Sequence, residues 1–155
     1  MKGVGKFKFL PERPSLDTGI YIKNAIDNNP IYPEHSFMFK IVFYKDSRGR
    51  EPVREAILDI ANSGGKNARV NALKIAEYLK ILEHAGTRAG APYVKHLSGE
   101  IWELRPLRNR ILFFAFTGTE FVLLHHFIKK TQKTPANEIE QAKRNMNDFK
   151  ERNKI

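Results

Sequence analysis

Several features are missing from this 155-residue sequence, and each absence removes a class of protein. There is no cysteine, which excludes a disulfide framework, a thiolate metal site and a cysteine nucleophile. No run of 18 apolar residues occurs, and the first residues lack the apolar region of a secretory signal. We therefore expect a cytoplasmic protein without a membrane partner, and a composition of 41% hydrophobic and 28% charged residues predicts a globular fold.

Acidic side chains are also scarce relative to basic ones. Lysine and arginine number 27 and aspartate and glutamate 17, which gives a formal net charge of +10. The excess lies beyond residue 36, because residues 37–155 carry 22 basic and 13 acidic side chains. A basic excess of this size indicates a polyanionic partner such as a nucleic acid, the ribosome or an acidic protein.

The usual signatures of several enzyme classes are absent as well. The sequence has no phosphate-binding glycine loop, no dinucleotide fingerprint, no nucleophile-elbow motif and no evident pair of catalytic carboxylates. His125 and His126 are adjacent, and adjacent strand residues point to opposite faces, so we expect no metal and no cofactor. If the protein is an enzyme, its catalytic side chains are lysine, arginine and histidine. Such side chains are sufficient for RNA cleavage, in which the nucleophile is the substrate's own 2′-hydroxyl.

The chain divides at residue 36. Residues 1–36 hold four prolines and show little periodicity, so we interpret them as an N-terminal extension and residues 37–155 as the domain. Aromatic and β-branched content predicts strands, and apolar residues at helical spacing predict helices. Thr134 and Pro135 are expected to be the N-cap and the first residue of the last helix. The expected elements are a strand at 37–44, helices at 52–61 and 66–85, a connection at 86–99, strands at 101–105, 110–116 and 121–127, and a helix at 135–151. This β-α-α-β-β-β-α order predicts an α+β fold, with a small antiparallel sheet packed on a helical hairpin and a C-terminal helix, and with the helices on one face.

Alternation along residues 101–105 assigns the side chains to two faces. Trp102 and Leu104 share the face expected to meet the helices, so Glu103 and Arg105 are expected to face outward. A basic cluster on that open surface would neutralise several phosphates. Its members are Lys95, Arg105, Arg110, Lys129 and Lys130. The competing interpretation is an ordinary solvated surface, in which Arg105 pairs with Glu103.

Two segments carry a resemblance to a known family. They are residues 94–116, VKHLSGEIWELRPLRNRILFFAF, and residues 121–145, FVLLHHFIKKTQKTPANEIEQAKRN. Over residues 37–148 the sequence resembles the RelE/HigB superfamily of toxins from bacterial type II toxin–antitoxin modules, and most of all its phage-derived, HigB-type branch. The resemblance implies the fold above and an mRNA interferase that cuts ribosome-bound message and is neutralised by a cognate helix-turn-helix antitoxin.

The resemblance also implies site residues. Arg110 matches the arginine that contacts the scissile phosphate, Lys130 the basic residue that assists the leaving group, and His126 is the candidate histidine near the end of the last strand. The other matched positions imply contacts with RNA and its phosphates; they are Lys95, Arg105, Lys129 and Phe127. The sequence departs from RelE at Glu103 and Ile101, where RelE has lysines.

Two alternatives stay open at the level of the sequence. One is a ParE-like toxin that binds DNA gyrase and cuts nothing, and the other is a non-catalytic phage protein that only binds RNA or a protein. Arg110, Lys129 and Lys130 favour the nuclease, because the gyrase-targeting branch generally lacks these cations.

Overall fold

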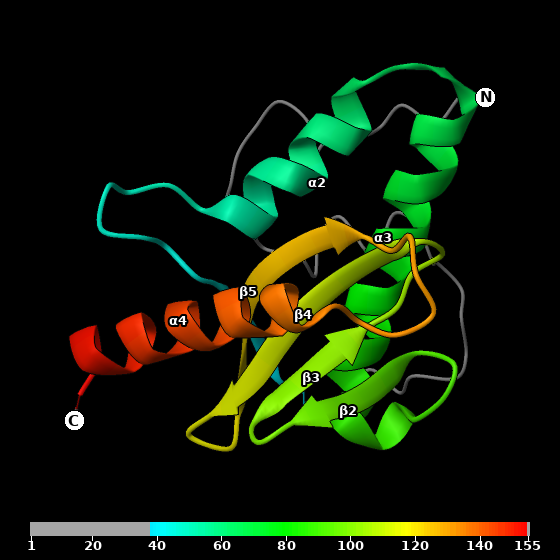
Figure 1. Ribbon diagram of the computed structural model, residues 1–155. Helices are drawn as coiled ribbons and strands as arrows, with labels where there is room; N and C mark the ends of the chain where they lie inside the picture. The colour runs from blue at the N-terminus through cyan, green and yellow to red at the C-terminus, as the bar shows by residue number, and fades with distance from the viewer. Residues whose placement is uncertain (1–37, 155) are drawn as a thin grey trace.

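The computed structural model describes residues 38–154, so the predicted extension at 1–36 lies outside the described residues. The described chain is an α+β domain, as the sequence predicts (Figure 1). Its elements are β1 (Lys40–Phe43), α2 (Pro52–Asn62), α3 (Gly65–Ala85), a 3-10 turn η2 (Gly86–Ala89), β2 (Val94–Ser98), β3 (Ile101–Leu104), β4 (Asn109–Phe116), β5 (Glu120–Ile128) and α4 (Ala136–Arg152). Among these residues no helix combines the length and the apolar character that crossing a bilayer requires.

The sheet has five strands in the order β1-β5-β4-β3-β2. The strands β2 to β5 pair antiparallel, whereas β1 runs parallel to β5, so the sheet is mixed and not antiparallel as expected. The strand β2 is an addition to the expected order, since the sequence predicts a connection over residues 86–99. It is a short edge strand with exposed Lys95 and His96 and a register shift after His96, features that weaken a strand pattern in the sequence.

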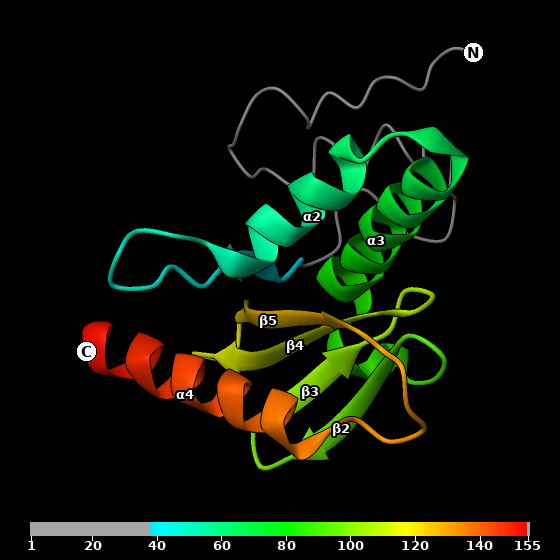
Figure 2. The ribbon, with the colours of Figure 1, turned by 45° about the horizontal axis from the view of Figure 1, so that its top comes forward.

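Helices cover both faces of this sheet, which corrects the expectation of one helical face (Figure 2). The helices α2 and α3 pack on one face, where Ile75 and Leu82 meet Ile111 and Phe113 of β4. The helix α4 packs on the other face, where Met146 lies in one cluster with Leu112 and Phe114. Strands buried on both faces read as continuous apolar runs, which explains the composition of β4 and β5.

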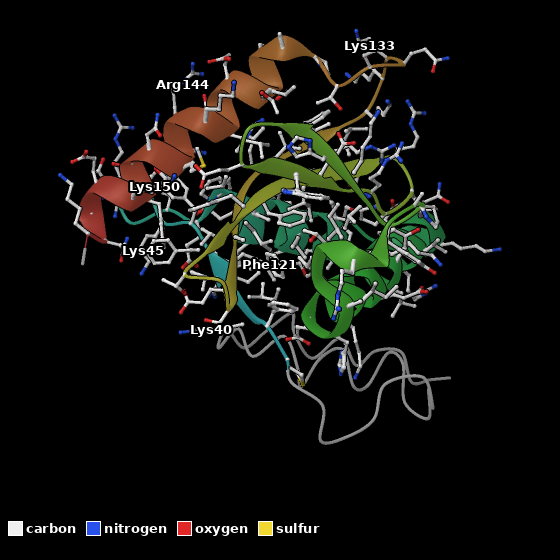
Figure 3. The ribbon with its side chains drawn as sticks, turned by 90° about the horizontal axis from the view of Figure 1, so that it is seen from below. Lys40, Lys45, Phe121, Lys133, Arg144 and Lys150 are labelled. Carbon is white, nitrogen blue, oxygen red and sulfur yellow. The ribbon has the colours of Figure 1, made fainter. Side chains whose placement is uncertain are left out.

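The hydrophobic core lies along β4 and β5. Phe121 is 3% exposed and lies between the sheet and the helical hairpin (Figure 3), where its ring meets those of Phe39 and Phe113 at 4.8 and 5.4 Å. Gly86 ends α3 with a φ of +62°, and a Cβ there would lie 2.8 Å from the Phe39 ring. Only glycine fits this close approach without a shift of the ring.

Hydrogen bonds and ion pairs anchor the C-terminal end of α4. The Tyr44 hydroxyl donates to Asp148 at 2.7 Å, and Arg152 donates both to Asp148 and to the Lys45 carbonyl oxygen. Burial, followed by the hydrogen bond to Asp148, raises the pKa of Tyr44 to about 12. These contacts tie the C-terminal end of α4 to the segment that follows β1. Lys150 faces the sheet, where its Nζ donates to Glu100 at 2.5 Å and lies 5.5 Å from the centre of the Phe114 ring, whereas Arg144 is exposed (Figure 3).

Candidate phosphate-binding site

A shallow hollow of about 500 Å³ lies at the end of the sheet where β3 passes into β4 and β5 passes toward α4. We call it the cationic hollow; its lining residues are Leu107, Arg108, Arg110, Lys129, Lys130, Thr131 and Gln132. Four of the seven are cations and none is acidic. Cations that line one space without an acidic residue beside them repel one another across it, so an anion bound in that space is stabilised.

Arg110 forms the floor of the cationic hollow. The residue is 8% exposed, and its Nη1 donates to the carbonyl oxygens of Leu107 at 2.7 Å and Asn109 at 2.8 Å. Burial lowers the pKa of Arg110, although Glu103 opposes this and Arg105 adds to it. Within the described chain Nη2 makes no hydrogen bond, so this nitrogen is available to an anion.

Backbone contacts fix the walls of the cationic hollow. The Lys129 N–H donates to the Arg108 carbonyl oxygen at 2.8 Å, and Arg108 Nη2 donates to the Lys129 carbonyl oxygen at 3.0 Å. Lys129 Nζ donates to the Gln132 carbonyl oxygen, which shapes the loop that follows β5. Lys130 is exposed, and its ammonium has no hydrogen-bond or ion-pair partner within residues 38–154.

A buried carboxylate lies beneath these cations. Glu103 is 1% exposed, and its Oε1 lies 3.6 Å from Arg105 Nε and 3.8 Å from Arg110 Nε. Its Oε2 accepts a hydrogen bond from the Thr134 hydroxyl at 2.5 Å. The expectation that Glu103 faces outward is therefore wrong, because α4 covers that face of the sheet. Thr134 is likewise not the N-cap of α4; Pro135 takes that position, and the Thr134 hydroxyl is used by Glu103.

Three expected contacts with RNA lie outside the cationic hollow. Arg105 pairs with Glu103, which is the alternative that the sequence left open. Lys95 is exposed on β2, directly opposite Glu103 in the strand register. Phe127 is paired with Arg110 in register but packs in the cluster beneath α4. Of the seven predicted site residues, Arg110, Lys129 and Lys130 are the ones that the structure brings together.

His126 lies on the opposite face of the sheet from Arg110. A register shift between β4 and β5 places one extra residue in β5, so that Arg110 pairs with Phe127 and His126 pairs with Ile111. Asn109 Nδ2 donates to Asn71 Oδ1 of α3 at 2.8 Å, so Asn109 Oδ1 accepts the hydrogen bond from His126 Nε2 at 2.9 Å. Burial, with a smaller effect of the charge on His125, lowers the pKa of His126 to about 4, so the ring is neutral at pH 7.

This histidine makes folding stability depend on pH. The imidazole binds a proton below about pH 6.5 in the unfolded chain but only below about pH 4 in the folded chain. The unfolded state is therefore favoured as the pH falls through this window, by up to ~1.4 kcal/mol per pH unit. We expect urea unfolding at several pH values to show His126→Gln losing less stability than the wild type between pH 6.5 and 4. Parallel pH profiles for the two proteins would contradict a buried, neutral His126.

His125 faces α4, where its Nε2 donates to Glu138 Oε1 at 2.5 Å. The two histidines thus lie on opposite faces, as their adjacency in the strand predicts. Across residues 38–154 no three histidine or acidic side chains gather in a way that could hold a metal ion.

The sequence does not predict four residues that line the cationic hollow, nor the buried carboxylate beneath it. The four are Leu107, Arg108, Thr131 and Gln132, which lie in the turn between β3 and β4 and in the loop after β5, where no periodic pattern marks them. The carboxylate is Glu103, which alternation predicts to face solvent, although Ile101 on the same face is apolar and 0% exposed. The apolar stripe of the last helix was the available signal that this second face is also covered.

Comparison with known proteins gives a family. No curated protein matches the chain significantly. A family model described as Phage derived protein Gp49-like (DUF891) matches residues 67–147, which is slightly more than half of the chain. The match runs from the first turns of α3 through β5 and most of α4, so it includes the whole lining of the cationic hollow and Glu103. The chain therefore belongs to the Gp49-like family of phage-derived proteins.

Proposed function

We propose that this protein is the toxin of a type II toxin–antitoxin module and cuts mRNA on the ribosome. The observation that carries the proposal is the cationic hollow, in which Arg108, Arg110, Lys129 and Lys130 surround a space without an acidic residue. The resemblance of residues 37–148 to the RelE/HigB toxins, with Arg110 and Lys130 at matching positions, agrees with it. Because its substrate is ribosome-bound message, we expect the protein to act in the cytoplasm.

The proposed reaction uses the RNA itself as the nucleophile. The 2′-oxygen attacks the adjacent phosphorus, the bond from phosphorus to the 5′-oxygen breaks, and a 2′,3′-cyclic phosphate and a 5′-hydroxyl form. The free Nη2 of Arg110 and the guanidinium of Arg108 bind the phosphate oxygens, whose negative charge grows in the transition state. Lys130 donates the proton that the leaving 5′-oxygen needs.

The lining of the cationic hollow contains no carboxylate or imidazole that would accept the 2′-hydroxyl proton. We assign that proton to solvent and not to His126. Burial lowers the pKa of His126 to about 4, which makes it a weak base, and the ring lies on the opposite face of the sheet from Arg110, where its Nε2 bonds Asn109. An enzyme that has a general acid but no general base depends more on the alignment of its substrate, so its rate rises most with a partner that aligns the RNA. This favours cleavage on the ribosome over cleavage of free RNA.

Primer extension on a reporter message, after brief induction of the chain in cells, tests the proposal. We expect discrete new 5′ ends inside translated codons, and their loss when translation is blocked. Coexpression of a helix-turn-helix protein encoded beside this chain should restore growth. Growth arrest without new ends would favour the gyrase-binding alternative, and the absence of both would leave a non-catalytic binding protein.

A further inference from the structure

We propose that Leu107 contacts a nucleobase of single-stranded RNA whose phosphate lies in the cationic hollow. The inference rests on the proposed function and names the part of the substrate that the hollow recognises besides the phosphate. Two observations on this residue carry it: the conformation of its backbone and the exposure of its side chain.

The backbone of Leu107 is strained. It lies in the turn between β3 and β4, closed by a hydrogen bond from the Asn109 N–H to the Pro106 carbonyl oxygen at 3.0 Å, and its φ is +59°. A side chain at positive φ is unfavourable, and glycine is the residue that such a turn prefers. Arg110 Nη1 donates a hydrogen bond to the Leu107 carbonyl oxygen, so the side chain that forms the floor of the hollow stabilises the strained conformation.

Leu107 is 46% exposed and lines the cationic hollow. An apolar side chain in water among cations contributes nothing to folding, and in this backbone it costs stability. Strained backbone at an exposed position is characteristic of functional sites, where a ligand makes use of the side chain. Bound RNA would remove this apolar surface from water.

The chemistry of the surroundings identifies the ligand. The cations bind a phosphate, and an apolar neighbour binds the flat face of a base, so the combination fits a nucleotide. The bases of a duplex are stacked on one another and offer no free face, whereas single-stranded RNA does. Leu107 is thereby a specificity-determining residue that distinguishes a single-stranded nucleic acid from polyanions that lack bases.

Binding of the full chain to two fluorescent ligands tests this inference at constant salt. One ligand is a single-stranded RNA of about eight nucleotides, and the other is an abasic ribose-phosphate chain of equal length and charge. We expect Leu107→Ala and Leu107→Gly to weaken RNA binding ~5–10-fold while leaving binding of the abasic chain within about twofold. Leu107→Gly should fold at least as stably as the wild type, because glycine relieves the positive φ.

Thr117 supplies the matched control. It is exposed, has a φ of +58°, and lies in the turn at the other end of β4. Thr117→Gly should relieve the same strain without changing the binding of either ligand. Equal loss of both ligands by the Leu107 variants, wild-type RNA binding by these variants, or no preference of the wild type for RNA over the abasic chain would each overturn the inference.

The binding test and the cleavage test separate the two proposals. If the wild type cuts message but the Leu107 variants bind RNA normally, the inference fails and the proposed function stands. If the wild type cuts nothing but the Leu107 variants lose RNA selectively, the inference stands and the catalytic proposal fails. Loss of an acidic peptide partner by the variants with unchanged RNA binding would assign Leu107 to a protein contact and overturn the inference.

Discussion

Replacing Glu103 by alanine should lower the free energy of unfolding by about 3–5 kcal/mol, the largest effect on stability expected of a single residue in the site. Glu103 Oε1 is the anion nearest to the Nε atoms of Arg105 and Arg110, which are buried and make no hydrogen bond. The substitution leaves these guanidinium groups without a counter-charge and removes the acceptor of Thr134. Urea or thermal unfolding measures the change, which corresponds to about 10–15 °C in Tm.

Glu103→Gln should cost less than Glu103→Ala, because the amide keeps an oxygen for Thr134 while it loses the charge. Glu140→Ala is the matched control. Its carboxylate pairs with Lys143 at 3.7 Å on the exposed surface of α4, so its removal should change stability by no more than about 0.5 kcal/mol. Equal stability of the Glu103→Ala and Glu140→Ala variants would show that the buried carboxylate does not hold the arginines in the folded state.

Replacing Lys130 by alanine should reduce message cleavage by about 100-fold or more, the largest functional effect expected without loss of fold. Its ammonium is exposed and unpaired within the described chain, so its removal leaves no buried group unsatisfied. The loss follows from the missing proton donor, since general acid catalysis contributes at least this factor. Primer extension at matched protein levels measures it, with unfolding curves to verify that stability is unchanged.

Lys133 is the control for Lys130. It lies in the same loop (Figure 3) and is exposed, but it does not line the cationic hollow. Lys133→Ala should cut message at the wild-type rate. Wild-type cleavage by Lys130→Ala would remove Lys130 from the proposed chemistry, and equal loss in both variants would indicate a general effect of charge.

Arg110→Ala is a poorer probe of the same site. Its guanidinium satisfies the carbonyl oxygens of Leu107 and Asn109 and lies near the buried Glu103. Truncation would remove the side-chain donor of both carbonyl oxygens and one of the two cations beside Glu103, and it is expected to destabilise the fold by about 3 kcal/mol. Lost activity in this variant would therefore mix catalysis with folding, whereas the Lys130 variant separates them.

The sequence by itself determined most of the elements and part of the site. The helices α2, α3 and α4 follow from apolar residues at helical spacing, and β3 to β5 follow from aromatic and β-branched runs. Arg110, Lys129 and Lys130 are brought together by local geometry, since antiparallel pairing of β4 and β5 joins the start of one strand to the end of the other. Sequence patterns are sufficient to predict a site when its residues come from segments that are close along the chain.

Only the tertiary structure decided which face each side chain serves. The apolar stripe of α4 fits either face of the sheet, and its place on the second face is what buries Glu103. The pairing of β1 with β5 is a long-range contact that no local pattern records. The strand β2 was hidden by its charged, irregular edge.

The position of His126 depends on a single extra residue in β5. Continuing the regular register from Phe113 and Leu123 would pair Arg110 with His126 and bring the two predicted catalytic residues to one face. One extra residue in β5 shifts this register, so Phe127 pairs with Arg110 and His126 turns toward Asn109 and α3. Successive side chains in a strand point to opposite faces, so a shift of one residue moves the side chains of the shifted segment to the opposite face. The register that forms is the one that buries the apolar side chains on both faces of the sheet.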